Sequence, residues 1–88
     1  MAVELSKDHD NFLVKAAKWT KAHRNLYCPI TAVKHIPNWK RVMDDLKSWG
    51  LVQPYKAGET VIITKAGWEY LAAEHPEIVM RKHPRSGP

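Results

Sequence analysis

Apolar residues recur at the spacing of an α-helix over about residues 6–23. At roughly 100° per residue, one face of this segment is apolar and the opposite face carries lysines. The apolar face contains Phe12, Ala16, Trp19 and His23, with Leu13 and Thr20 at its edge. Ser6, Asp8 and Asp10 are all residue types that cap a helix N-terminus. The pattern predicts an amphipathic helix that begins near one of these three residues and ends near His23.

Two prolines divide the next stretch of the chain. Pro29 cannot lie inside a helix, and Pro37 ends any helix that precedes it. Between them, Thr31 is a candidate N-cap for a short second helix over residues 32–36. Asn38 is the candidate N-cap of a third helix, and Gly50 is its left-handed C-terminal residue. The apolar stripe of this third helix consists of Trp39, Val42, Met43, Leu46 and Trp49.

After Gly50 the pattern changes from helical to extended. Residues 51–55 and 60–63 are typical of two strands, joined by a turn over residues 56–59 that is built around Gly58. Pro54 restricts the first strand to a sheet edge or a strand end. Thr64 caps a fourth helix over residues 65–74, followed by Pro76 and one short turn over residues 77–80. We expect the fourth helix to bury Trp68, Leu71 and Ala72.

This order of elements predicts an α+β fold that is mostly helical. The second and third helices form a helix-turn-helix, a motif that places its second helix in the DNA major groove. The hairpin that follows occupies the position of a wing. We therefore expect one winged-helix domain over residues 1–80, with a three-helix core, a hairpin wing and a C-terminal helix. Residues 81–88 are expected to form a flexible basic tail.

Two short runs resemble a known family. The run Trp49-Gly50-Leu51-Val52, and the run Ile63-Thr64-Lys65-Ala66-Gly67 followed by Leu71, are similar to the winged helix-turn-helix regulators of the MarR and ArsR type. The similarity covers about residues 11–73 and implies the winged-helix fold and a DNA-binding regulator. The chain departs from the family in two respects, because it has room for only one short additional helix and because Pro37 shortens the second helix.

The resemblance assigns candidate DNA contacts by position. The third helix presents Asn38, Lys40, Arg41, Asp44 and Lys47, while Thr31, Lys34 and His35 lie near phosphates and Lys56 stands at the wing tip. Asparagine and arginine read purines through paired hydrogen bonds, and lysine binds phosphate or guanine. Asp44 has two interpretations. Either it accepts a hydrogen bond from a cytosine amino group, or it indicates that this face does not bind DNA.

The distribution of charge adds a second hypothesis. The formal net charge is +5, and no acidic residue occurs between Asn11 and Met43. A segregated positive field attracts nucleic acids and acidic proteins alike. The first hypothesis is a non-enzymatic transcriptional regulator that binds double-stranded DNA, with a homodimer on a palindromic site as a further expectation. The alternative is a protein-interaction module, an adaptor or a phage-type inhibitor, whose Lys15, Lys18 and Lys21 contact an acidic partner.

Other classes of chemistry are not indicated. Cys28 is the single cysteine, which excludes an internal disulfide and a Cys-based zinc cluster, and the five histidines show no metal-ligating spacing. We expect no enzyme activity, metal or cofactor. RNA binding is not favoured, because no predicted strand presents paired aromatic residues for base stacking. The segment Met1–Leu5 has no secretory-signal pattern, and no apolar run approaches the roughly 20 residues that cross a bilayer, so we expect a cytoplasmic protein without a membrane partner.

Overall fold

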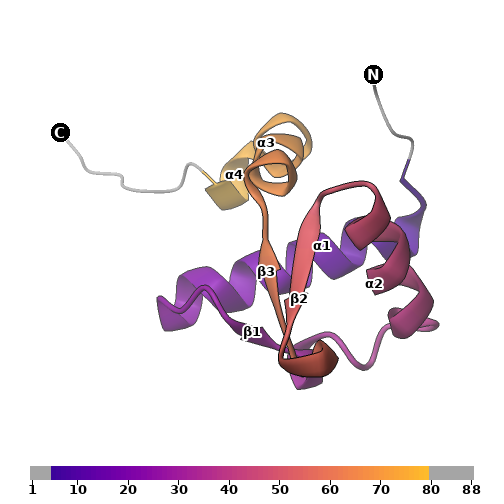
Figure 1. The fold of residues 1–88 in the computed structure, drawn as a ribbon. Coiled ribbons are helices and arrows are strands. Elements are labelled where there is room, and N and C mark those ends of the chain that lie inside the picture. Colours follow the sequence, from indigo (N-terminus) through magenta and orange to yellow (C-terminus); the bar gives the residue numbers. More distant parts are fainter. Residues whose placement is uncertain (1–4, 80–88) are drawn as a thin grey trace, which may run out of the picture.

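The structure is a computed structural model that describes residues 5–79. Its fold is α+β and mostly helical (Figure 1). The expected basic tail and the last residue of the expected turn over residues 77–80 lie outside the described residues. In chain order the elements are α1 (Lys7–His23), β1 (Cys28–Pro29), the short 3₁₀ helix η1 (Ile30–Ala32), α2 (Trp39–Ser48), β2 (Val52–Tyr55), the 3₁₀ helix η2 (Lys56–Gly58), β3 (Thr60–Ile63), α3 (Lys65–Glu74) and α4 (Pro76–Val79).

The three strands form one small antiparallel sheet in the order β1-β3-β2. The hairpin β2–β3 has the predicted boundaries to within one residue, and β2 is an edge strand, as Pro54 requires. The prediction missed β1, which pairs Cys28 with Val61 and Pro29 with Thr60. A strand of two residues has too few positions to show a period of two, so only the pairing partner reveals it.

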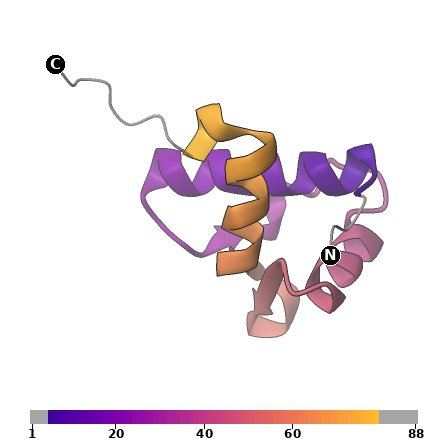
Figure 2. The ribbon, with the colours of Figure 1, turned by 90° about the horizontal axis from the view of Figure 1, so that it is seen from above.

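Helix α1 lies behind the sheet, and α3 crosses from the sheet toward α1 (Figures 1 and 2). The N-terminus of α1 is capped by Ser6, whose hydroxyl accepts a hydrogen bond from the backbone N–H of His9 at 3.3 Å. The buried side chains of α1 are Phe12, Leu13, Ala16, Ala17 and Thr20. The expected apolar face is therefore wrong at one edge, because Trp19 is half-buried and His23 is exposed. The buried face is turned toward Leu13 and Ala17, since α1 packs against α2 as well as against β3.

Helix α2 buries three of the five residues of its predicted stripe, Val42, Met43 and Leu46. Trp39 is half-buried. Trp49 was expected in the core but is 39% exposed, because it lies at the C-cap where the helix ends and its ring contacts the imidazole of His9 instead. Gly50 is left-handed with φ 76°, as predicted. Its N–H donates to Lys47 and that of Leu51 to Leu46, a Schellman arrangement that satisfies the last carbonyls of the helix.

The predicted second helix is wrong. Residues 30–38 form η1 followed by turns, in which the N–H groups of Val33, Ile36 and Trp39 each donate to the carbonyl three residues earlier. Seven residues between two prolines are too few to nucleate an α-helix, and the residue before a proline is disfavoured in helical conformation. Thr31 therefore lies inside η1 and is not an N-cap.

Asn38 was also predicted to cap α2 with its side chain, and it does not. Its backbone is left-handed, with φ 57°, and its side chain forms no capping hydrogen bond. Asparagine tolerates this conformation better than most residues. This left-handed residue redirects the chain between Pro37 and α2, and Asn38 is exposed.

The two runs that resemble the regulator family meet in space. The Thr64 hydroxyl caps α3 by accepting from the N–H of Gly67 at 3.1 Å, and it donates to the Gly50 carbonyl at 2.6 Å. The N–H of Thr64 donates to the Leu51 carbonyl at 3.0 Å. A Cβ on Gly67 would lie 2.3 Å from that same carbonyl oxygen, so only glycine fits there. This junction joins the end of α2 to the start of α3 across the hairpin.

Within α3, Leu71 is buried as predicted, Trp68 is half-buried, and Ala72 is exposed contrary to the prediction, because it lies off the face that packs.

Candidate nucleic-acid interface

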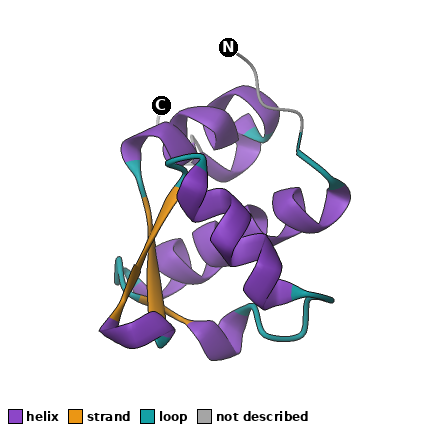
Figure 3. Cartoon of the chain, turned by 45° about the vertical axis from the view of Figure 1, so that its right-hand side comes forward, coloured by secondary structure: helices purple, strands orange, loops and turns teal. Residues whose placement is uncertain are grey.

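A groove separates α2 from the hairpin, and three of the predicted DNA-contact residues line it. Its α2 wall consists of Lys40, Met43, Asp44 and Lys47, and its hairpin wall of Gln53, Pro54, Ala57 and Gly58. Figure 3 shows the two elements side by side, with η2 and the turns before α2 at the same end. Met43 is buried and reaches toward Gly58, so its side chain forms part of the groove floor. The groove therefore carries two ammonium groups and one carboxylate above an apolar base.

The other six predicted residues do not line this groove. All nine are exposed: Thr31, Lys34, His35, Asn38, Lys40, Arg41, Asp44, Lys47 and Lys56. Arg41 lies on α2, Lys34 and His35 lie on the turns that lead into α2, and Lys56 begins η2 at the hairpin tip. The structure thus brings the α2 residues and the hairpin turn together on one side, whereas Thr31, Lys34 and His35 lie on η1 and the turns that precede α2.

The cations of this surface are not neutralised by neighbouring carboxylates. Within residues 5–79, no lysine or arginine nitrogen lies within 4.0 Å of a carboxylate oxygen, and every ion pair in that range involves a histidine. The exposed residues of α2, its preceding turns and η2 with the following turn include five cations (Lys34, Lys40, Arg41, Lys47 and Lys56) and two carboxylates (Asp44 and Glu59). The positive potential of this side therefore remains available to a partner.

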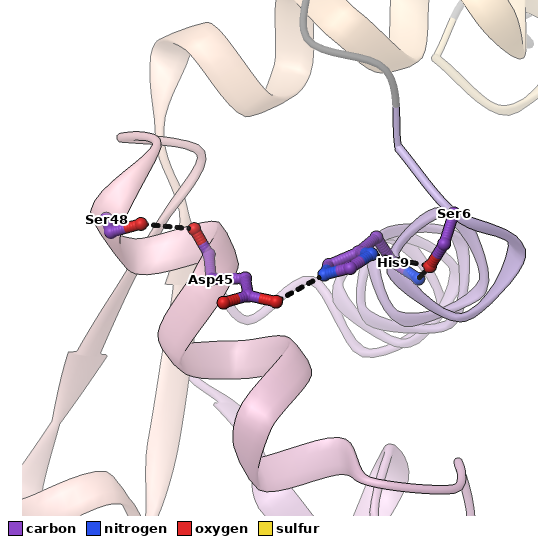
Figure 4. A network of polar contacts seen from close by, with 4 residues as sticks. All are labelled: Ser6, His9, Asp45 and Ser48. Carbon is purple, nitrogen blue, oxygen red and sulfur yellow. Dashed lines mark hydrogen bonds and ion pairs between the residues drawn. The ribbon is translucent and has the colours of Figure 1, made fainter.

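The two consecutive carboxylates of α2 have different environments. Asp45 is half-buried, and its Oδ2 lies 2.9 Å from Nε2 of His9 on α1 (Figure 4). The other imidazole nitrogen, Nδ1, lies 2.5 Å from the Ser6 hydroxyl, and the ring packs on Trp49 at 4.9 Å. Asp44 is exposed in the groove. Of these two carboxylates, only Asp44 therefore affects the charge of the candidate interface, whereas Asp45 joins α2 to α1.

The N-terminus of α2 has no side-chain cap. The N–H of Trp39 donates to Ile36, but no capping side chain accepts from the next N–H groups, those of Lys40 and Arg41. The first N–H groups of a helix carry partial positive charge and are common ligands of phosphate oxygens. At this helix they lie beside two exposed cationic side chains.

The alternative protein-binding surface on α1 also consists of exposed residues. Lys15, Lys18 and Lys21 are all exposed. The ammonium group of Lys21 donates to the carbonyl of Val79 at 3.1 Å, so this residue helps to attach α4. Lys18 and Lys21 border a groove between α1 and α4 that also contains Ile78.

A second network links α1 to α3 and α4 and was not predicted. The Tyr70 hydroxyl donates to Asp10 Oδ1 at 2.6 Å, and Nε2 of His75 lies 2.8 Å from the same oxygen. Burial, followed by the hydrogen bond to Asp10, raises the pKa of Tyr70 above its usual range. Asp10, expected only as a possible helix cap, is thus a tertiary contact that spans 60 residues of sequence.

Cys28 is buried in the sheet, and burial raises the pKa of its thiol to about 11. A thiol that stays protonated at neutral pH is a poor nucleophile, so Cys28 packs as a small apolar residue. Among residues 5–79, no three His, Cys, Asp or Glu side chains come together where a metal ion would bind. No helix within the same range is long and apolar enough to cross a membrane.

Comparison of the chain with protein-family models, with curated proteins and with solved structures found no match.

Proposed function

We propose that this protein binds double-stranded DNA as a winged-helix module, with α2 in the major groove and the hairpin β2–β3 beside it. The observation that carries the proposal is the exposed face of α2. There Lys40, Arg41 and Lys47 have no carboxylate partner within residues 5–79. The same face borders the hairpin groove and ends at an uncapped helix N-terminus. An α-helix has the width that the major groove admits.

In this proposal different residues have different roles. Lys34 and Lys56 contact phosphates on either side, and the free N–H groups at the start of α2 receive a phosphate oxygen. Arg41 and Asn38 read base edges, because both are exposed at the start of the helix that enters the groove. Because one copy presents one such helix, a palindromic site takes two copies of the chain.

The winged-helix interpretation rests on the position of the hairpin. The hairpin follows α2 directly, and the Thr64–Gly67 junction holds its far end against the C-terminus of α2. The segment before α2 consists of η1 and turns where a helix-turn-helix has its first helix. Its residues Thr31, Lys34 and His35 are exposed, which suits contacts with the DNA backbone.

The test is a titration of a labelled duplex at several salt concentrations, followed by fluorescence anisotropy. Log affinity should fall linearly with log salt, with a slope of about −0.9 per phosphate contacted. Lys40→Ala combined with Lys47→Ala should weaken binding and reduce the magnitude of this slope by about 2, or about 1 per lysine. Lys15→Ala combined with Lys18→Ala removes the same charge from α1 and serves as the matched control. Equal losses in the two double variants would show that only net charge matters, and the proposed surface would then be wrong.

Base reading is tested on a site selected from a randomised duplex pool. Arg41→Ala should weaken binding to that site by about 1–3 kcal/mol and relax the preference at one base position. Asp44→Ala should strengthen binding to any duplex if Asp44 only repels phosphates. It should weaken binding to the selected site alone if Asp44 accepts from a cytosine amino group. A selection that returns no preferred sequence would limit the function to sequence-independent binding.

A second candidate function is favoured by the groove between α1 and α4. Lys18 and Lys21 border this groove next to Ile78 and one carboxylate, that of Glu77, so it offers more cations than anions beside apolar surface, which suits an acidic protein partner. In that case the α1 double variant should slow association with the partner, while the α2 double variant should leave it unchanged. The two pairs of variants therefore separate the two functions with one set of proteins.

A further inference from the structure

The sheet has an outer face that no described helix covers. Alternate residues of a strand point to opposite sides. Of the inner side's five residues, Cys28, Val52, Val61 and Ile63 are buried in the core, and Pro54 is half-buried. On the other side the register places Gln53 opposite Ile62, and Thr60 between Tyr55 and Pro29. In Figures 1 and 2, α1 lies behind the strands and this outer face points away from it.

Two tyrosines meet on this face from opposite edges of the sheet. Tyr27 precedes β1 and Tyr55 ends β2, and their exposed fractions are 50% and 43%. Their ring centroids lie 5.6 Å apart with an interplanar angle of 89°. In such an edge-to-face pair, the partner covers one face of one ring and neither face of the other. The N–H of Tyr27 donates to the Asn25 side chain at 2.9 Å, which fixes the segment that carries the first ring.

Cationic residues lie near both tyrosines in the sequence. Leu26, next to Tyr27, is 57% exposed and lines a groove of about 640 Å³ together with Trp68, Lys21 and Arg24. At the other end of the pair, Lys56 follows Tyr55 directly. Arg24 and Lys56 are exposed and have no carboxylate within 4.0 Å in residues 5–79. The tyrosine pair thus has an exposed cation next to Tyr55 in the sequence and another three residues before Tyr27.

We propose that this outer face of the sheet is a binding site for single-stranded nucleic acid, centred on the two tyrosines and sharing only Lys56 with the proposed duplex surface. Unpaired bases stack on Tyr27 and Tyr55, and Arg24 and Lys56 bind the adjacent phosphates. Exposed aromatic rings beside cations are the means by which proteins hold single strands without reading sequence, because every base has a flat face. The bases of a duplex are already stacked on each other, so this face prefers single strands. An acidic protein would be attracted by the cations but would not require two open tyrosine rings.

The sequence expectation concerned aromatic residues paired on a predicted strand, whereas this pair joins the residue before β1 to the last residue of β2. Tyr27 precedes a strand that the hydrophobic pattern did not predict, and it lies 28 positions before Tyr55 in the sequence. Only the pairing of β1 with β3 brings the two rings together.

The test uses labelled single strands of thymidine or uridine, about 12 nucleotides long, and a duplex as the reference. Tyr27→Ala and Tyr55→Ala should each weaken binding to the single strands by about 5- to 150-fold, the range expected for loss of one stacked base. Tyr27→Phe and Tyr55→Phe keep the ring and should bind within about 2-fold of the unchanged protein. The two oligonucleotides show whether DNA or RNA is preferred. Far-UV circular dichroism and thermal melting show whether each variant is folded.

Duplex binding in the same samples distinguishes this site from the proposed function. The tyrosine variants should leave duplex affinity unchanged, and Lys40→Ala with Lys47→Ala should lower duplex affinity more than single-strand affinity. Three results would overturn the single-strand site: no single-strand binding at low salt, alanine variants that bind as the phenylalanine variants do, or equal losses for single strands and duplex. The single-strand site would also be wrong if this face bound an acidic protein but no single strand.

Discussion

The N-terminal half of α1 and the exposed face of α2 carry charged residues that are used in opposite ways. On α1, His9 pairs with Asp45, and the carboxylate of Asp10 forms hydrogen bonds with Tyr70 and His75. These polar groups therefore find their partners inside the protein. On α2, Lys40, Arg41 and Lys47 find no carboxylate partner within residues 5–79. Paired polar groups orient helices, whereas unpaired like charges repel each other and cost stability. The first region therefore holds elements of the fold together, whereas the second leaves its cations accessible at the surface.

This contrast predicts that substitutions under and around α1 change stability, while substitutions on the outer face of α2 change binding. The largest stability effect is expected for Leu46→Ala. Leu46 is fully buried on the inner face of α2, and removal of such a side chain costs about 2–5 kcal/mol through lost burial and the cavity left behind. Urea denaturation measures the free energy of unfolding. Lys47→Ala, the exposed neighbour, is the control and should change it by no more than about 0.5 kcal/mol. A small effect of Leu46→Ala would mean that α2 is not anchored by this face.

A smaller loss is expected for Gly67→Ala at the junction of the two regions. Its new Cβ would lie 2.3 Å from the Leu51 carbonyl oxygen and 2.7 Å from a methyl group of Ile63. Backbone shifts that relieve such overlap cost about 1–3 kcal/mol. Ala66→Ser changes the exposed preceding position and is the matched control. If the substitution moves the hairpin relative to α2, Gly67→Ala should also weaken duplex binding. An unchanged duplex affinity would show that this junction does not position the proposed interface.

Tyr70→Phe is expected to cost about 1 kcal/mol near neutral pH, because Asp10 loses one hydrogen-bond donor. Tyr27→Phe, which removes the hydroxyl of an exposed tyrosine, should cost nearly nothing. The alkaline pH dependence sharpens the test. The pKa of Tyr70 is raised above its ordinary value of 10.0 in the folded protein, so the unfolded chain ionises first. Its stabilising contribution is therefore complete below about pH 10 and is lost as the pH rises above that value. Tyr70→Phe should reduce this alkaline loss of stability in denaturation curves, and an unchanged alkaline slope would contradict the assignment.

The smallest effect on stability should come from Lys40→Gln combined with Arg41→Gln. Both side chains are exposed and lack carboxylate partners within residues 5–79, so the free energy of unfolding should change by less than about 0.5 kcal/mol. Any change should be toward higher stability at low salt, because two positive charges are removed from a basic surface. A clear loss of stability in this variant would show that the two cations have partners in the folded protein, and the contrast with α1 would fail.

Much of the secondary structure could be predicted because its signals are local. The start of α3 follows from the predicted N-cap Thr64, and the start of α1 lies at Ser6, one of three candidate caps; both side chains act within three residues of themselves. Gly50 ends α2 because it accepts the left-handed conformation that closes a helix. The hairpin follows from a change of hydrophobic period and from Gly58. In each case the residues that determine the structure are neighbours in the chain.

The predictions failed where a distant contact or a competing local restraint prevailed. The segment between Pro29 and Pro37 has apolar residues that suit a helix, yet it is too short for one and forms η1 and turns. Trp49 continues the apolar stripe of α2 in the sequence, but its ring lies on His9 at the surface. The nine predicted contact residues are exposed in the structure, and their proposed role in binding DNA stays a prediction.

The sequence by itself determined α1, α2, α3, the hairpin, the caps Thr64 and Gly50 and the exposed basic face of α2, because periodicity and capping act over a few residues. Tertiary structure alone decided which polar groups are partnered and which aromatic rings meet. Asp44 and Asp45 are equivalent in the sequence, and only the packing of α1 on α2 gives Asp45 to His9, which lies 36 positions away. Tyr27 and Tyr55 are brought together only by β3, which pairs with both of their strands. Such contacts have no local pattern, since they depend on how helices and strands from distant parts of the chain bury their apolar faces against each other.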